Sequence, residues 1–362
     1  FKPREYQNLI INQILDKPRT AIWAGMGMGK TSSTLTALET MYLAGESRPT
    51  LVLAPLRVCN STWPEEAHKW AHLTEIDVQP VTGDEKNRLA ALKRDASIYA
   101  CNYQNIPWLV DHYGAHWPFG TVVADESTRL KSFRLRQGGV RAQALAKVAH
   151  KNVKRFINLT GTPAPNGLQD LWGQTWFLDA GQRLGRTYSA FTDRWFCRTA
   201  DGFGRELRSQ SAADEIYNKL RDICLTIEAR DWFDLKEPIV KEIEVEMPRS
   251  ARRLYDQLKK DLILQIEQHT ITAANAAVKT QKLLQMANGA AYVDPNTEDD
   301  HDPRAREYRI VHDAKLEALD SIIEECNGAP ILLAYNFRSD LERILEAFKF
   351  AEVLDDNPET LR

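Results

Sequence analysis

A glycine-rich segment that ends in lysine and threonine, residues 24–31, carries the clearest chemistry of this 362-residue sequence. It follows a short apolar run, 20–24, and precedes a stretch with helical spacing, 31–43. Glycines let backbone N–H groups turn inward around phosphate oxygens, and the N-terminus of the following helix attracts negative charge. In such a loop Lys30 reaches the β- and γ-phosphates of a nucleotide and the Thr31 hydroxyl ligates Mg²⁺. The pattern therefore predicts a phosphate-binding loop, and a glycine-rich turn that only caps a helix is the less favoured alternative. The glycines expected to contact phosphate are Gly25, Gly27 and Gly29.

An acid pair, Asp125 and Glu126, directly follows the apolar run 121–124. A parallel strand delivers such residues to the carboxyl edge of its sheet, where ligands of α/β proteins bind. Asp125 suits a contact, through a water ligand, to the Mg²⁺ that Thr31 holds, and Glu126 is then placed to orient and deprotonate the attacking water. Alone, the pair would more often belong to a helix N-terminus. Together with the phosphate loop it indicates nucleotide hydrolysis.

A basic stretch follows the acid pair. Residues 127–169 hold no Asp or Glu, although the whole chain has 50 acidic residues against 47 Lys and Arg and a net charge of −3. A basic surface on a mildly acidic protein suits a polyanion whose phosphates contact lysine and arginine. The alternative is a solvated face whose charge is balanced elsewhere. The residues expected to contact nucleic acid are Arg129, Lys131, Arg134 and Arg136.

The elements that must position these residues alternate along the first half of the chain. Short apolar runs are separated by helix-length stretches, which predicts an α/β fold with a parallel sheet covered by helices on both faces. From 181 to 236 the chain is aromatic and charged without a strand-like run, and we expect a mostly helical insertion packed by its aromatic rings rather than a base-stacking surface. The predicted strands are 50–54, 97–100, 121–124, 156–159, 239–245 and 330–335, the later helices 250–268, 315–325 and 339–348, and an exposed loop 297–309.

With these motifs in this order, the chain resembles helicase superfamily 2, and within it the Swi/Snf-type branch of double-stranded DNA translocases. Residues 4–7 resemble the adenine-recognition motif, with Arg4 beside Gln7 and Gln7 in the purine-contact role. Residues 53–56, with Trp63 after them, resemble motif Ia, and 125–131 resemble motif II. Weaker second-domain landmarks are 285–288 and 334–337. Residues 159–166 resemble motif III, whose Thr160, Gly161 and Thr162 would couple loss of the γ-phosphate to a neighbouring surface.

The sequence departs from the branch in three respects: one residue of motif II, the missing late motifs and a short accessory region. Thr128 stands where motif II usually has His or Asp, and its hydroxyl can still bond toward motif III, so we expect altered coupling rather than lost hydrolysis. No segment after Phe337 resembles motif V or the arginine-bearing motif VI, so a second motor domain would be incomplete within these residues. The short accessory region is typical of a compact microbial or phage-like member.

The resemblance implies tandem RecA-like domains: a first ATP-binding domain at 1–180, a helical insertion at 181–237, and the start of a second domain at 238–362. It implies a nucleic-acid-dependent ATPase that uses ATP and Mg²⁺ and translocates along or remodels double-stranded DNA without sequence specificity. The alternatives are a strand-separating or RNA-directed helicase, acting on single-stranded DNA or RNA, and an ATP-gated binding protein without efficient turnover.

The composition bears on the compartment. No apolar run is long enough for a membrane span, and the five cysteines form no CxxC pair, so we expect reduced thiols rather than a metal site. These features predict a cytoplasmic protein, at the nucleoid or in a host cell's cytoplasm if its source is a microbe or phage.

Overall fold

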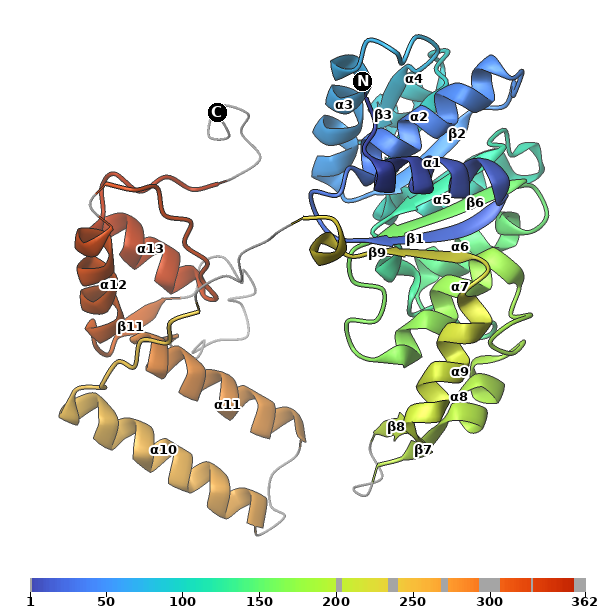
Figure 1. Cartoon of the computed structure of the whole chain (residues 1–362). Coiled ribbons are helices and arrows are strands. Elements are labelled where there is room, and N and C mark those ends of the chain that lie inside the picture. The colour runs from blue at the N-terminus through green and yellow to red at the C-terminus, as the bar shows by residue number, and fades with distance from the viewer. Residues whose placement is uncertain are drawn as a thin grey trace. The chain divides into compact units, whose positions relative to one another are not determined.

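Two units make up the chain in its computed structural model, Phe1–Glu237 and Pro238–Arg362 (Figure 1). The structure describes residues 2–199, 204–233, 240–267, 273–292, 307–326 and 328–354. Within these ranges, no helix is long and apolar enough to cross a bilayer.

A seven-stranded sheet lies at the centre of the first unit, in the order β3-β4-β2-β5-β6-β1-β9. Every neighbouring pair is parallel. The strands predicted at 50–54, 97–100, 121–124 and 156–159 are confirmed as β2, β4, β5 and β6, and the α/β fold class with them. The strand bounds are β1 Arg19–Ala24, β2 Thr50–Ala54, β3 Val78–Val81, β4 Ile98–Asn102, β5 Thr121–Asp125, β6 Arg155–Thr160 and β9 Cys224–Ile227.

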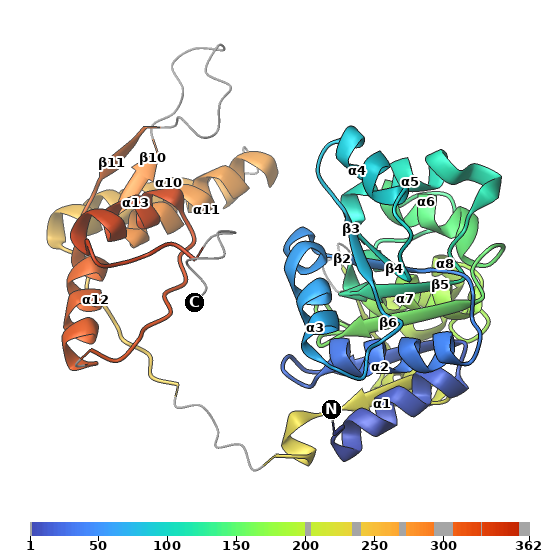
Figure 2. The same cartoon turned by 90° about the horizontal axis from the view of Figure 1, so that it is seen from above.

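Helices cover both faces of this sheet (Figure 2). Successive strand residues point to opposite faces, so Trp23 packs in one buried cluster with α5, α6, α7 and α9, while Ile22 packs in the other with α1, α2 and α3. Both clusters consist of apolar side chains removed from water, which is the main stabilising contribution of such a core. The helix bounds are α1 Glu5–Asp16, α2 Lys30–Leu43, α3 Trp63–Lys69, α4 Glu85–Leu92, α5 Ile106–Tyr113, α6 Val140–Ala149, α7 Leu171–Asp179, α8 Tyr188–Trp195 and α9 Gln210–Leu220.

The expectation that 181–236 holds no strand is wrong. β9 pairs with β1, with Ala21 opposite Cys224, and adds the outermost strand to the sheet. The short strands β7 (Phe196–Arg198) and β8 (Arg205–Leu207) form an antiparallel pair. β9 has only four residues, too few for a recognisable apolar run. Residues 181–233, expected as an insertion beside a domain at 1–180, therefore complete the sheet of the first unit.

Several aromatic side chains of this region and of the preceding α7 pack as the sequence predicts, although Tyr217 and Trp232 are exposed. Trp172, Phe177, Phe191 and Trp195 are buried in the same cluster as the sheet residues. Phe191 lies 5.4 Å from Trp195 and 5.3 Å from Phe196 between ring centroids. Rings held in this way are not available to stack on bases.

The second unit consists of four helices and a short antiparallel strand pair in its described part. The helices predicted at 315–325 and 339–348 are confirmed, and the one predicted at 250–268 is confirmed over 250–267, since 268 lies outside the described residues. The strand predicted at 239–245 is not found over 240–245, and 239 lies outside the described residues, as does 297–306 of the predicted loop. The element bounds are α10 Arg249–Glu267, α11 Ala273–Asn288, β10 Ala290–Tyr292, β11 Tyr308–Ile310, α12 Ala314–Glu325 and α13 Arg338–Ala347.

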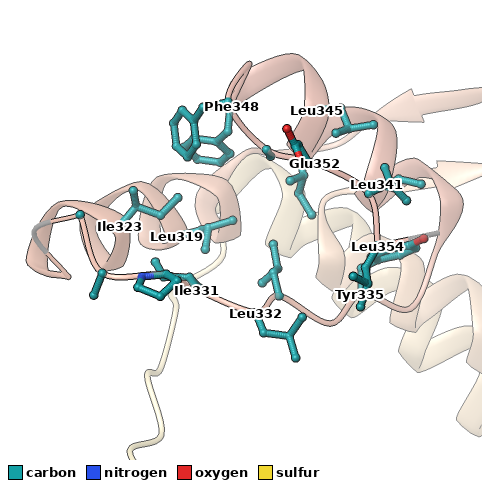
Figure 3. A pocket seen from close by; sticks show the side chains of 18 residues that line it. Leu319, Ile323, Ile331, Leu332, Tyr335, Leu341, Leu345, Phe348, Glu352 and Leu354 are labelled. Carbon is teal, nitrogen blue, oxygen red and sulfur yellow. The ribbon is translucent and has the colours of Figure 1, made fainter. Parts of the chain in front are cut away.

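The buried strand predicted at 330–335 is also not found. This segment is extended but unpaired, and Leu332 is 85% exposed. It borders a cavity of about 640 Å³ (Figure 3), where Leu319 of α12 and Leu345 of α13 also point into the apolar space. A parallel strand needs hydrogen-bonding neighbours, and the described residues of this unit form no parallel sheet that could supply them. A pattern that reads as a core strand therefore lies at a surface.

Ile216 of α9 tests whether this region belongs to the fold of the first unit, because its side chain is fully buried in the core. We expect Ile216→Ala to lower the free energy of unfolding by about 2–5 kcal/mol, the usual loss for a truncated core side chain. All nine tryptophans lie in the first unit, so tryptophan fluorescence during urea denaturation reports on it alone. Tyr217→Ala is the control, since Tyr217 is 48% exposed on the same helix. An unchanged midpoint for Ile216→Ala would mean that α9 is an independent appendage.

Candidate functional site

The carboxyl ends of three adjacent strands bring the predicted motifs together. In the sheet order β5-β6-β1, Asp125 pairs with Leu159 and Trp23 pairs with Thr160. The glycine-rich loop leaves β1, the acid pair ends β5, and Thr160 ends β6. All three segments therefore meet at one edge of the sheet, where the sequence places a ligand site.

The glycine-rich loop turns through two left-handed residues before α2 begins at Lys30. Gly27 has φ of 75° and Gly29 has φ of 67°, a region that glycine adopts without steric cost. Lys30 Nζ donates to the carbonyl oxygens of Ala24 (2.8 Å) and Gly25 (2.9 Å). Burial lowers the pKa of Lys30, and the negative charges of Asp125 and Glu126 act in the opposite direction. The ammonium therefore lies inside the loop and within electrostatic reach of the acid pair.

The residues assigned to adenine recognition lie against this loop. Gln7 is buried, and its Oε1 accepts a hydrogen bond from the Arg4 backbone N–H (2.8 Å). A Cβ added at Gly29 would collide with Gln7 Nε2, which shows how closely the two approach. The Arg4 guanidinium lies 4.9 Å from the ring centre of Phe233, and that ring lies 5.7 Å from Tyr6. No local pattern predicts Phe233 at this position, because it lies more than 200 residues from Arg4.

The backbone of Glu126 has a conformation that is unusual for a non-glycine residue. Its φ of 62° lies in the left-handed region, which costs about 1–2 kcal/mol for an L-residue. Its Oε1 accepts from the hydroxyls of Thr128 (2.5 Å) and Thr160 (3.0 Å). The Thr128 hydroxyl was expected to bond toward motif III. It donates to the same carboxylate oxygen as Thr160, the motif III residue. These two donors fix the direction of the Glu126 carboxylate.

Tyr103, which follows β4, holds the backbone of the acid pair. Its hydroxyl donates to the carbonyl oxygens of Asp125 (3.0 Å) and Glu126 (3.4 Å). Burial raises the pKa of Tyr103 well above its ordinary value, so the hydroxyl keeps the proton that it donates. The sequence analysis missed this residue, because nothing local marks a tyrosine after a strand as a partner of residues on another strand.

Asp125 and Thr31 offer the oxygens that Mg²⁺ prefers. Burial raises the pKa of Asp125, and its bond from Trp63 Nε1 (2.9 Å to Oδ2) and the charge of Lys30 act in the opposite direction. Among the described residues there is no group of three or more His, Cys, Asp or Glu side chains that could hold a metal. Mg²⁺ is usually bound by one or two protein oxygens together with substrate phosphates and waters. The donor set therefore fits Mg²⁺ carried by a nucleotide.

The motif III segment contacts both the acid pair and the phosphate loop. Thr162 N–H donates to Thr160 Oγ1 (3.1 Å), which itself donates to Glu126. A Cβ on Gly161 would lie 3.4 Å from the Ala24 carbonyl oxygen, so the backbone packs directly on the start of the loop. The Thr-Gly-Thr residues thus join the two halves of the site.

Gln174 of α7 connects this segment to the core. Its side chain is buried, donates to the Pro163 carbonyl oxygen (2.7 Å) and accepts from the Ser127 hydroxyl (2.8 Å). The Asn158 side chain of β6 donates to the backbone carbonyl oxygen of Gln174 (3.0 Å). One amide therefore ties the residue after the acid pair to the end of motif III.

The four basic residues expected to contact nucleic acid lie in two kinds of environment. Lys131 pairs with Asp170 at 3.2 Å. Arg134 lies 3.4 Å from the ring centre of Tyr188 and donates to backbone carbonyl oxygens. Arg129 and Arg136 are exposed to solvent. Lys131 and Arg134 thus hold the segment after motif II in place, and Arg129 and Arg136 carry its free surface charge.

Gly29 tests the contact between the loop and Gln7. We expect Gly29→Ala to destabilise the first unit more than Gly27→Ala. Both alanines bear the left-handed cost of about 1–2 kcal/mol, but only the Cβ at 29 collides with Gln7, and no described atom lies within 4 Å of a Cβ at 27. Urea denaturation followed by tryptophan fluorescence measures the difference. Adding Gln7→Ala to Gly29→Ala should restore part of the loss, and a strictly additive double variant would contradict the contact.

Known proteins similar to this chain support the family that the motifs indicate. The SNF2-related domain matches residues 19–290. Protein p41 of Acyrthosiphon pisum secondary endosymbiont phage 1 is 55% identical over 100% of this chain and 78% of its own length. Helicase SWR1 of Yarrowia lipolytica is 26% identical over 65% of this chain, which spans only 13% of that protein.

A solved structure shares the fold. The Sulfolobus solfataricus SWI2/SNF2 ATPase core in complex with double-stranded DNA matches 90% of this chain and 65% of its own chain, with a TM-score of 0.52 and 20% identity. The phage relative agrees with the expectation of a compact phage-like member. By its motifs and by the match over residues 19–290, the chain belongs to the SNF2-related domain family, in the Swi/Snf-type branch of superfamily 2.

Proposed function

We propose that the chain binds ATP with Mg²⁺ at the carboxyl edge of the first sheet and hydrolyses it under the control of double-stranded DNA, along which it translocates or which it remodels. The observation that carries this proposal is the Glu126 carboxylate, held by two threonine hydroxyls beside a lysine-bearing phosphate loop. A fixed carboxylate next to a phosphate site is what a water-activating base requires. The chain's SNF2-related family supports the same reading.

Nucleotide binding would begin with an exchange of partners at Lys30. Its ammonium now donates to the carbonyls of Ala24 and Gly25, and it would transfer these bonds to β- and γ-phosphate oxygens. The loop N–H groups and the N-terminus of α2 would surround the same phosphates. Thr31 would hold Mg²⁺ directly and Asp125 would hold it through water ligands, and the ion, when bound, neutralises charge on the phosphates. Gln7, with Arg4 beside it, would recognise the adenine.

Hydrolysis would use the free oxygen of Glu126. Thr128 and Thr160 both donate to Oε1, which leaves Oε2 to accept a proton from the water that attacks the γ-phosphate. Loss of that phosphate would affect Thr160 through its hydrogen bond to Glu126, and would affect Gly161 through its packing on the loop. Gln174 would pass the change to the segment after motif II.

Nucleic acid would be contacted mainly through its phosphates, by Arg129 and Arg136 on the exposed part of the basic stretch, with Lys131 and Arg134 shaping it. The related archaeal core was solved with double-stranded DNA, which favours a duplex as the partner here. Arg129 also lies 5.9 Å from the ring centre of Tyr103, whose hydroxyl holds the acid pair. DNA bound at Arg129 would therefore be linked to the backbone of the acid pair through a single side chain, Tyr103. We place this activity in the cytoplasm, at the nucleoid or in a host cell.

ATPase assays with duplex DNA, single-stranded DNA and RNA separate this proposal from its rivals. Stimulation by duplex DNA is the expected result, because contacts to phosphates do not require exposed bases. Stimulation by RNA alone would favour an RNA-directed helicase. If the protein binds ATP but hydrolyses it with none of the three nucleic acids, an ATP-gated binding protein would be favoured.

Glu126→Gln tests the catalytic carboxylate. The amide keeps the size of the side chain and can still accept from Thr128 and Thr160, but it cannot take a proton from water. We expect ATP binding to be retained and hydrolysis to fall at least about 100-fold, the range for loss of a general base. Glu65→Gln, at an exposed position of α3, is the control and should hydrolyse ATP at the parent rate. Parent-level hydrolysis by Glu126→Gln would remove Glu126 from this role.

Arg129→Ala and Arg136→Ala test the proposed DNA contacts. Each change should weaken duplex binding without regard to sequence and reduce the slope of log K against log salt by about 1, because each lost cation leaves one phosphate with its counterion. Lys86→Ala, an exposed lysine of α4 outside the basic stretch, should leave both quantities unchanged. Binding isotherms at several salt concentrations provide the measurement. An unchanged slope in the double arginine variant would place the DNA surface elsewhere.

A further inference from the structure

Trp63 is fully buried at the start of α3, yet its one polar atom reaches the functional site. Its Nε1 donates to Asp125 Oδ2 at 2.9 Å. The contact spans two strands, because α3 follows β2 whereas Asp125 ends β5, and β2 and β5 are neighbours in the sheet. The sequence placed Trp63 beside motif Ia but assigned it no role.

The backbone before Trp63 is adapted to this contact. Residues Val58–Thr62 form a π-helical turn, and the Trp63 N–H donates to the Val58 carbonyl five residues earlier. Such turns are rare and often occur at functional sites, since the extra residue rotates the side chains that follow. Within the same turn Cys59 Sγ contacts the Ala54 carbonyl oxygen at 3.5 Å, which anchors the turn to the end of β2.

A buried indole does not have to find an acceptor in this fold. Trp117 is 6% exposed, and its Nε1 has no hydrogen-bond partner among the residues that the structure describes. The two buried indoles therefore differ, because Trp63 has a carboxylate acceptor and Trp117 has none among the described residues. The bond fixes Oδ2 of a carboxylate that also accepts a hydrogen bond from the Glu126 backbone.

We propose that Trp63 is a positioning residue of the metal site, whose indole N–H fixes Asp125 Oδ2 so that Oδ1 faces the hydration shell of the nucleotide's Mg²⁺. This inference rests on the proposed ATP site and adds to it a residue that touches neither ATP nor Mg²⁺. Partners that orient a metal-binding carboxylate commonly change metal affinity about 10- to 100-fold when they are removed. Trp63 should therefore affect how tightly ATP binds with Mg²⁺, and should not affect how tightly ATP binds without it.

Trp63→Phe tests the proposal, because phenylalanine keeps an aromatic ring in the core and removes the N–H. Equilibrium binding of a fluorescent ATP analogue is measured during a Mg²⁺ titration and again in EDTA. We expect the Mg²⁺ concentration at half-saturation to rise about 10-fold, while the affinity in EDTA stays close to that of the parent. Trp117→Phe is the matched control, since it removes an indole N–H that has no described acceptor.

A second pair of variants separates positioning from packing. In an Asp125→Asn background, Trp63→Phe should cause no further rise in the Mg²⁺ requirement, because the carboxylate that it orients is gone. Three results would each overturn the role of Trp63 but leave the proposed ATP site standing. These are additive increases of the Mg²⁺ requirement in the double variant, an unchanged Mg²⁺ requirement in Trp63→Phe, and an equal loss of nucleotide affinity with and without Mg²⁺. A parent protein whose nucleotide binding does not depend on Mg²⁺ would overturn the proposed site together with this inference.

Discussion

The parallel register of β5, β6 and β1 is the constraint on which the site depends. Each strand carries one part of the chemistry at its carboxyl end, and parallel pairing brings these ends to the same edge. Reversal of β6 would move Thr160 to the opposite edge and leave Glu126 without one of its two donors. The buried strands therefore do more than build a core, because their direction decides which loops meet.

Around this edge, buried donors compensate for an unfavourable backbone. The left-handed φ of Glu126 costs stability, and the hydroxyls of Tyr103, Thr128 and Thr160 bond to the same short segment. Hydrogen bonds to a charged carboxylate contribute more than neutral ones. The strained residue is thus held by groups from three other positions, which suits a carboxylate that must keep one direction while the nucleotide changes.

Local patterns predict much of this molecule. The glycine-rich loop, the acid pair and the strands β2, β4, β5 and β6 follow from composition and spacing, because each is encoded within a few consecutive residues. The apolar run 330–335, which was predicted as a strand and is not one, shows the limit of such reasoning: an apolar run becomes a strand only where another strand pairs with it. β9 shows the converse, since four unremarkable residues become a strand beside β1.

Side-chain partners across the fold could not be predicted in this way. Trp63, Tyr103 and Phe233 each act on residues far away in the sequence, and no local spacing announces such a contact. Arg134 reads as a surface cation in a basic stretch, yet Tyr188 covers it. The sequence thus predicts which groups carry the chemistry, whereas their orientation depends on contacts that only the folded chain brings together.

The contact between Arg4 and Phe233 has a topological consequence. It joins the beginning of α1 to Phe233, the last described residue of the first unit, so the described ends of this unit lie close together. A unit with adjacent ends is suited to circular permutation, in which a short linker joins them and a surface loop is opened instead. It also places Phe233, late in the first unit, beside Arg4 and Gln7, the residues assigned to adenine.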